Sequence, residues 1–120
     1  MNRWTLLQHE RINNQTCDVH YDLLLENGQD CKTWKLLILP TLDGPPVEIF
    51  KHSNHRLIWL TIESERLTHN RGYVKRVDNG TFTLLGTDLD SNNFSLILKG
   101  NHIEGLFKKN GDVCKLISLN

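Results

Sequence analysis

The sequence predicts an all-β fold, a compact closed or nearly closed antiparallel β-barrel with little helix. Three Asn-Gly dipeptides are flanked by apolar or β-branched runs, at Asn27-Gly28, Asn79-Gly80 and Asn110-Gly111. Asn-Gly supplies the two positive-φ residues that a type I′ hairpin turn needs. About nine short apolar runs follow one another at the spacing of ~8–12 residues that is typical of a barrel or sandwich. No stretch has convincing helical periodicity.

The expected elements follow the chain in order. The candidate helical turn is near Ser64–Leu67, and Trp4, Trp34 and Phe82 are expected to pack the interior because they alternate with polar neighbours. The segment 40–48 is expected to be a loop because proline removes a donor from a sheet ladder, and the polar segments 9–18 and 89–93 are also expected to be loops. The expected strands are 3–8, 20–26, 33–39, 56–63, 72–77, 81–86, 94–100, 104–109 and 112–119.

Length and composition indicate one small domain, spanning 1–120. A chain of this length buries roughly 65% of its unfolded surface, which is enough for a stable core without disulfides. The 14 acidic and 14 basic residues balance, which argues against broad electrostatic capture of nucleic acid. Cys17, Cys31 and Cys114 are odd in number and lack C-x-x-C spacing, so reduced thiols are expected. The polar N-terminal segment and the absence of an apolar run near ~18 residues predict a cytoplasmic monomer with no membrane partner.

The strand expected at 20–26 carries an unusual polar face. Because side chains alternate along a strand, His20, Asp22 and Glu26 share one face with Leu24, whereas Tyr21 points toward the core. One face therefore presents an imidazole and two carboxylates. A solvated face with a chance His and Asp is the alternative, since strands tolerate many residue types on an exposed face.

The polar face of this strand could form part of a metal site. His9 ends the first expected strand, and one antiparallel pairing would bring it beside His20 and Asp22. Two imidazole nitrogens and one carboxylate oxygen suit a divalent cation such as Mn²⁺ or Zn²⁺. Cys17 is nearby, but we interpret it as a small buried residue because thiolates favour softer sites.

The residues resemble the 3′-phosphoesterase domain of bacterial DNA ligase D and its small stand-alone relatives. That family has a leading His followed by a His-Tyr-Asp-x-Arg-x-Glu strand, matched here by His9 and by His20-Tyr21-Asp22 with Glu26. The resemblance runs over nearly the whole chain. Its further landmarks, in family order, are Lys32-Thr33-Trp34, Asn54-His55-Arg56-Leu57 with Trp59, the segment 77–82 and the closing strands of 94–109.

The resemblance implies a β-barrel enzyme with a polar crevice. Members of the family use manganese to remove a 3′-phosphate or 3′ ribonucleoside from a DNA primer terminus during repair. A nucleic-acid 3′ end is therefore the expected substrate, and a ligase or polymerase is a candidate partner.

The resemblance also implies roles for particular residues. His9, His20 and Asp22 would hold Mn²⁺ or another divalent cation. His20, Asp22 and His55 would be the catalytic residues, with a protonated His55 contacting the scissile phosphate. Glu26 would orient a ligand histidine, and Trp59 would offer a stacking surface to the substrate.

Departures from the family pattern keep two other functions open. Leu24 replaces the family's arginine and cannot grip phosphate, and the family lysine after the Trp strand is missing, with Lys35 near but expected out of position. Two such losses could abolish the reaction, since each costs on the order of 10²-fold. The alternatives are a non-catalytic nucleic-acid or phosphate-binding barrel with a vestigial metal site, and a small-ligand barrel. Compensating cations could come from Lys51, Arg56, Arg71 or Lys75, although we favour a solvent-exposed role for the last two.

Overall fold

The computed structural model describes residues 2–13, 16–68, 71–86 and 88–119. Within these residues, ten strands form one antiparallel sheet in the order β4-β10-β9-β8-β7-β1-β2-β3-β5, with β6 also paired to β7. The all-β prediction is confirmed, but the sheet is not closed, because β4 and β5 end this path without pairing to each other among the described residues. The elements are β1 Arg3–Asn13, β2 Thr16–Asn27, β3 Asp30–Leu36, β4 Val47–Glu48, β5 Phe50–Arg56, the 3₁₀ helix η1 Leu57–Leu60, β6 Ser64–Arg66, β7 Tyr73–Leu85, β8 Asn93–Gly100, β9 Glu104–Asn110 and β10 Val113–Ile117.

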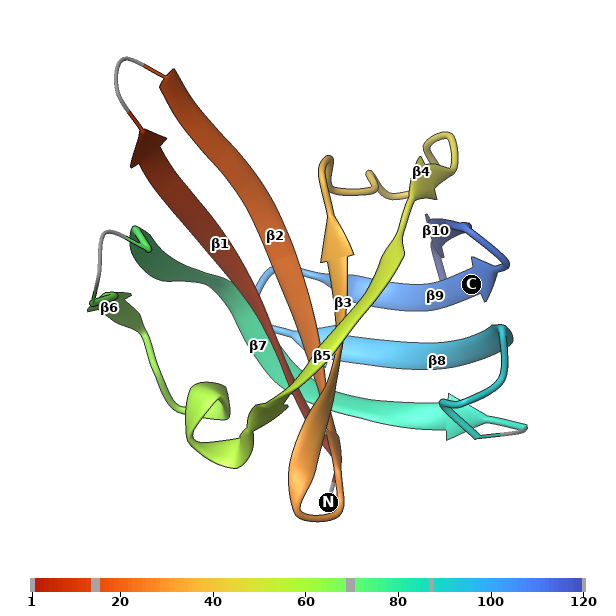
Figure 1. The fold of residues 1–120 in the computed structure, drawn as a ribbon. Coiled ribbons are helices and arrows are strands. Elements are labelled where there is room, and N and C mark those ends of the chain that lie inside the picture. Colours follow the sequence, from red (N-terminus) through yellow and green to blue (C-terminus); the bar gives the residue numbers. More distant parts are fainter. Residues whose placement is uncertain (1, 14–15, 69–70, 87, 120) are drawn as a thin grey trace.

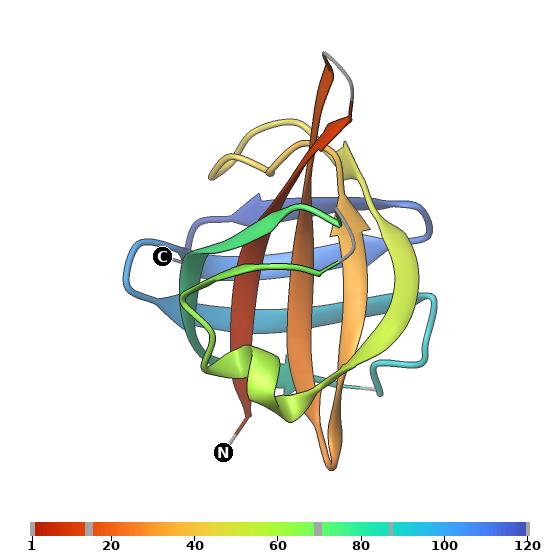
Figure 2. The same ribbon diagram turned by 60° about the vertical axis from the view of Figure 1, so that its left-hand side comes forward.

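The sheet folds over itself into two crossing layers (Figures 1 and 2). The long strands β1, β2 and β3 run across β8, β9 and β10, and β7 passes from one layer to the other. The main core fills the space between the layers and includes Trp4, Trp34 and Phe82, as predicted. Trp34 on β3 contacts Phe94 on β8, with ring centroids 5.2 Å apart. Aromatic packing between β3 and β8 thus helps to hold the two layers together.

A second, smaller core covers the opposite, outer face of β1, β2 and β3. It consists of Leu7, Leu24, Cys31, Leu60 and Val74. Leu60 belongs to η1, so the short helix packs on the outside of the sheet and screens part of that face from solvent (Figure 2). The outer face of the β1–β2–β3 layer is therefore bordered by η1, which leaves a partly sheltered surface for a binding site.

The β1–β2 hairpin is longer than the sequence predicts. Most of the predicted loop 9–18 continues the two strands, which pair from Trp4↔Leu25 to Asn13↔Thr16 and project beyond the rest of the sheet (Figure 1). Side chains of the extension, such as Arg11 and the apolar Ile12, are exposed rather than packed. The end of the first strand at His9 was thus misplaced, although the pairing that it predicted is present.

Two of the three Asn-Gly dipeptides lie at hairpin turns, but the predicted type I′ geometry is wrong there, because the glycine has positive φ and the asparagine before it does not. Gly28 and Gly111 have φ values of 71° and 59° and follow the last residues of β2 and β9. The third prediction is wrong, because Asn79 and Gly80 lie inside the continuous strand β7. Gly80 pairs with both Trp4 of β1 and Gly100 of β8, and a Cβ there would lie 1.8 Å from the carbonyl oxygen of Lys99. Glycine is needed at this position for close approach of two backbones where the strand changes layers.

The segment after the Pro/Gly loop also differs from the prediction. The expected strand 56–63 contains instead the helix η1, and the expected helical turn near Ser64–Leu67 contains instead β6. The strand that occupies this region, β5, is polar and mostly exposed, so it lacked the apolar alternation that would have predicted it. Within the described residues, no helix combines the length and apolar character needed to cross a membrane.

Candidate metal centre

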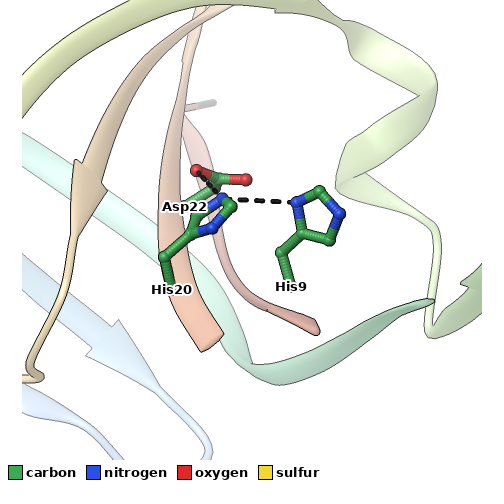
Figure 3. Close-up of side chains that lie close together, drawn as sticks. All are labelled: His9, His20 and Asp22. Atoms are coloured by element: carbon green, nitrogen blue, oxygen red, sulfur yellow. Dashed lines mark hydrogen bonds and ion pairs between the residues drawn. The ribbon is translucent and has the colours of Figure 1, made fainter. Parts of the chain in front are cut away.

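The outer face of β1 and β2 brings His9, His20 and Asp22 together. His9 is the direct cross-strand partner of His20, and Asp22 lies two residues further along β2 on the same face. Their nearest ligand atoms all lie within 4.8 Å of one another (Figure 3). The grouping that the sequence predicted from one antiparallel pairing is present in the structure.

Hydrogen bonding fixes the tautomer of His9. Its Nε2 lies 2.6 Å from the carbonyl oxygen of Arg71, which can only accept, so Nε2 carries the proton. In the neutral ring the lone pair is therefore on Nδ1, which lies 3.3 Å from Nε2 of His20. A histidine anchored to a backbone carbonyl through one nitrogen, with the other nitrogen free, is the usual arrangement of a metal ligand.

Asp22 supplies the test of whether a cation fits. The residue is buried, and its Oδ1 has no hydrogen-bond partner among the described residues. Oδ1 lies 3.4 Å from Nε2 of His20, within ion-pair distance but without hydrogen-bond geometry. Because an unpaired buried carboxylate oxygen is costly, a cation between Asp22 and the two imidazoles would satisfy it. Nδ1 of His9, Nε2 of His20 and Oδ1 of Asp22 are the atoms that would hold it, and they suit Mn²⁺, Fe²⁺ or Zn²⁺.

A crevice of about 910 Å³ opens over this group. Its cationic side chains outnumber its carboxylates by four to two, although the whole chain has no net charge. It therefore favours an anionic ligand. Besides the three candidate ligands, its polar and aromatic lining includes His52, His55, Trp59, Asp18, Arg11, Lys35, Arg56 and Arg71.

Lys35 is the crevice residue that sequence reasoning misjudged. It was expected to be out of position, but in the sheet it is the cross-strand partner of Asp22 and therefore shares its face. Lys35 makes no hydrogen bond or ion pair within the part of the chain that the structure describes. The pairing of β2 with β3 was the signal that could have placed it. Of the other predicted cations, Arg56 and Arg71 line the crevice, and Lys51 and Lys75 do not.

His55 lies in the crevice but outside the three-residue ligand group. Its Nδ1 is 3.1 Å from the carbonyl oxygen of Ser53 and 2.9 Å from Oγ1 of Thr33. Since the carbonyl can only accept, Nδ1 carries the proton, and Nε2 is the free ring atom of the neutral form. Burial lowers the pKa of His55, outweighing the attraction of the nearby Asp22 carboxylate, which acts in the opposite direction. Burial thus favours the neutral ring of His55 in the free chain, whereas the resemblance implies a protonated ring at the scissile phosphate.

Leu24 lies in the second core, on the same outer face of the sheet as Asp22. The side chain is fully buried and packs with Leu7 and Leu60. The residue that stands where the resembled family has an arginine is thus an apolar core side chain in this protein. No phosphate contact can come from this position.

The remaining predicted site residues have different outcomes. Trp59 lines the crevice and contacts His55 edge to face, with ring centroids 6.2 Å apart. Glu26 was expected to orient a ligand histidine, and this is wrong: its carboxylate accepts hydrogen bonds from the backbone and guanidinium of Arg3 at the other end of β2. Cys17 was expected to be buried but is exposed at the edge of the crevice. His69 lies outside the described residues.

Comparison with protein-family models and with curated proteins finds no match for this chain. The geometry of the crevice is therefore the basis on which its function is inferred.

Proposed function

We propose that this chain is a divalent-metal-dependent phosphoesterase, with manganese as the metal and a nucleic-acid 3′ end as the substrate. The observation that carries the proposal is the buried Oδ1 of Asp22, which has no hydrogen-bond partner among the described residues and lies beside two imidazole nitrogens. This group opens into a crevice whose charge is locally positive. The ordered resemblance of the sequence to the phosphoesterase domain of DNA ligase D supports the choice of substrate.

Each residue of the crevice would have a separate role in such a reaction. A bound divalent cation supplies Lewis acidity at a phosphoryl oxygen. Lys35 offers an uncompensated positive charge beside Asp22, where it would offset charge on the phosphate. Neutral His55, held by Ser53 and Thr33, has Nε2 free to take a proton from an attacking water. Trp59 presents an aromatic surface next to His55.

The test measures metal binding and turnover separately. Manganese binding to the full chain is followed by electron paramagnetic resonance, and hydrolysis is followed on a primer–template with a 3′-phosphate. We expect both in the wild type, and loss of both in His20→Ala. His102→Ala is the matched control, because His102 lies outside the crevice. A wild type that binds no manganese, or His20→Ala that binds it equally well, would contradict the metal site.

One observation favours a second candidate, a non-catalytic phosphate-binding module. Leu24 is fully buried where the family has a phosphate-binding arginine, so one charged contact is lost. Manganese binding and affinity for the 3′-phosphorylated DNA, without any hydrolysis, would support this candidate. Turnover that is abolished by Asp22→Asn would reject it.

A further inference from the structure

A second cavity lies on the opposite side of the β1–β2–β3 layer from the metal centre. Its volume is about 350 Å³. One wall consists of Leu6, Leu23 and Leu36 from β1, β2 and β3; the other includes Leu98 and Phe107 from β8 and β9; residues 39–41 close it. We refer to this space as the apolar cavity.

The apolar cavity is a pocket with a buried base and an open rim. Leu6, Leu23 and Leu36 of the base are between 2% and 5% exposed. At the rim, Thr41 is exposed and Val77 is half-buried, so the space opens to solvent on this side. An open pocket with an apolar base is a common form of small-molecule site.

The lining of the apolar cavity disfavours a charged occupant. Among the described residues that line it, none is charged. Its polar side-chain groups are the hydroxyl of Thr41 and the indole N–H of Trp4, which already donates to the carbonyl of Lys99 at 3.3 Å. An apolar molecule that enters therefore displaces water that has few polar partners in the protein.

The segment that closes the cavity can admit a molecule without opening the sheet. Residues 39–41 are irregular, and they are tied to β10 just beyond the cavity by the hydrogen bond from the amide of Asp43 to the carbonyl of Leu116. Just before them, Ile38 is 67% exposed and is not among the residues that line the cavity. This apolar side chain therefore does not fill the pocket.

We propose that the apolar cavity binds a neutral, largely apolar small molecule. Engineered apolar cavities of about 150 Å³ accept benzene, so 350 Å³ corresponds to two linked or fused rings with their substituents. One hydrogen-bonding group on that molecule can meet Thr41. The site is separate from the metal centre, and neither metal nor phosphate takes part in it.

The experiment titrates the full-length chain with N-phenyl-1-naphthylamine, a neutral dye that fluoresces in apolar surroundings. The wild type is expected to bind one molecule saturably, and His20→Ala is expected to bind it equally well. Val77→Phe places a larger ring in the cavity lining and is expected to weaken binding at least tenfold. Leu85→Phe, on the same strand but outside the lining, should leave it unchanged.

A second variant, in the closing segment, tests the same site independently in case Val77→Phe does not fold. Thr41 is exposed, so Thr41→Trp changes the entrance without disturbing the core and is expected to weaken dye binding in the same way. Absence of saturable binding by the wild type would overturn the proposal. Equal binding by wild type, Val77→Phe and Thr41→Trp would place the dye elsewhere and overturn it as well.

Thermal unfolding without dye tests whether the space itself exists. If the cavity is open, Val77→Phe fills it and raises the melting temperature relative to Leu85→Phe. If side chains of the closing segment have collapsed into it, the added ring overpacks the core and lowers the melting temperature. The second result would also overturn the proposal.

Discussion

His9 and His20 stand directly opposite each other on β1 and β2, with Nδ1 of His9 3.3 Å from Nε2 of His20. Two nitrogen lone pairs at this distance repel unless a proton or a cation lies between them. The Nε2 proton of His9 is already committed to the carbonyl of Arg71. Nδ1 of His9 is therefore the acceptor for a proton on Nε2 of His20, and a metal ion bound between these nitrogens and Asp22 would displace that proton.

Asp22→Asn should separate the stability of the empty site from its affinity for metal. Without metal, we expect the free energy of unfolding to rise by about 1 kcal/mol, because the substitution removes charge from a buried, unpartnered oxygen. Saturating manganese should raise the melting temperature of the wild type and not of the variant. Asp18→Asn makes the same charge change on the same strand and should keep the metal-dependent shift. Urea and thermal unfolding measure these effects, and an equal manganese shift in both variants would argue against Asp22 as a ligand.

His55 should titrate at lower pH than an ordinary histidine. Burial lowers its pKa below the usual value of about 6.5. The unfolded chain then binds more protons than the folded chain just below pH 6.5, so the stability that neutral His55 allows is lost as pH falls through this window. NMR titration of the imidazole measures the pKa directly, with His102 as the internal comparison. A His55 pKa above that of an unperturbed histidine would contradict the buried, neutral ring.

Lys35→Met should impair the proposed hydrolysis without affecting metal binding. The substitution keeps most of the apolar stem and removes the charge beside Asp22. We expect kcat/KM on the 3′-phosphorylated substrate to fall on the order of 10²-fold, as for other single contacts to a reacting oxyanion. Manganese affinity should change little. Lys115→Met, on β10 and outside the crevice, is the control, and equal activity of the two variants would remove Lys35 from the site.

An arginine at position 24, where the resembled family has one, should destabilise this protein. Leu24 is fully buried in the second core, so Leu24→Arg buries an unpaired charge and is expected to cost about 3 kcal/mol or more of stability. Leu24→Met conserves volume and should cost less than about 1.5 kcal/mol. Urea denaturation compares the two. A stable, more active Leu24→Arg would mean that this side chain reaches the crevice.

Asp78 should be the most important structural carboxylate outside the crevice. Its carboxylate accepts hydrogen bonds from the backbone amides of Asn79, Asn101, His102 and Ile103 and so ties β7 to the β8–β9 turn. Burial alone would raise its pKa, but these four bonds outweigh burial and lower it.

Asp78→Asn is therefore expected to lower the free energy of unfolding by about 2 kcal/mol or more, because the amide cannot accept from all four donors. Since the folded pKa is depressed, the stabilisation is complete above the ordinary aspartate pKa of about 3.9 and is lost as pH falls below it. Urea unfolding between acidic and neutral pH measures the difference. Asp112→Asn, in the exposed β9–β10 turn, should show neither effect.

The parts of the molecule that the sequence predicted are those set by local chemistry. Hairpin turns occur at Gly28 and Gly111 because glycine supplies the positive φ, although the asparagine before each ends the strand and does not adopt the predicted turn conformation. The same dipeptide at Gly80 lies within a strand because tertiary approach of β8 requires glycine for another reason. Strand β5 was missed because its residues are polar and mostly exposed, although it carries His55.

The residues of the candidate site that depend on a single strand pairing were predicted correctly. His9, His20 and Asp22 come together through the β1–β2 register, which alternation along the strands allowed us to infer. Lys35 was misjudged because its place depends on the register of a second pair, β2 with β3. Glu26 was misassigned because sharing a face does not imply proximity: at 3.3 Å per residue, four positions along a strand separate it from Asp22 by ~13 Å.

The two-residue connection at Gly28 has a consequence at the far end of its hairpin. Asp22 and Lys35 face the metal centre, while their chain neighbours Leu23 and Leu36 face the apolar cavity. Because the side-chain period of a strand is two, one inserted residue in β3 would exchange these faces. The lysine would then point into the apolar cavity and a leucine into the crevice. The two-residue turn at Gly28 thus fixes which side chains line the crevice and which line the apolar cavity, and a shift of register would change both linings together.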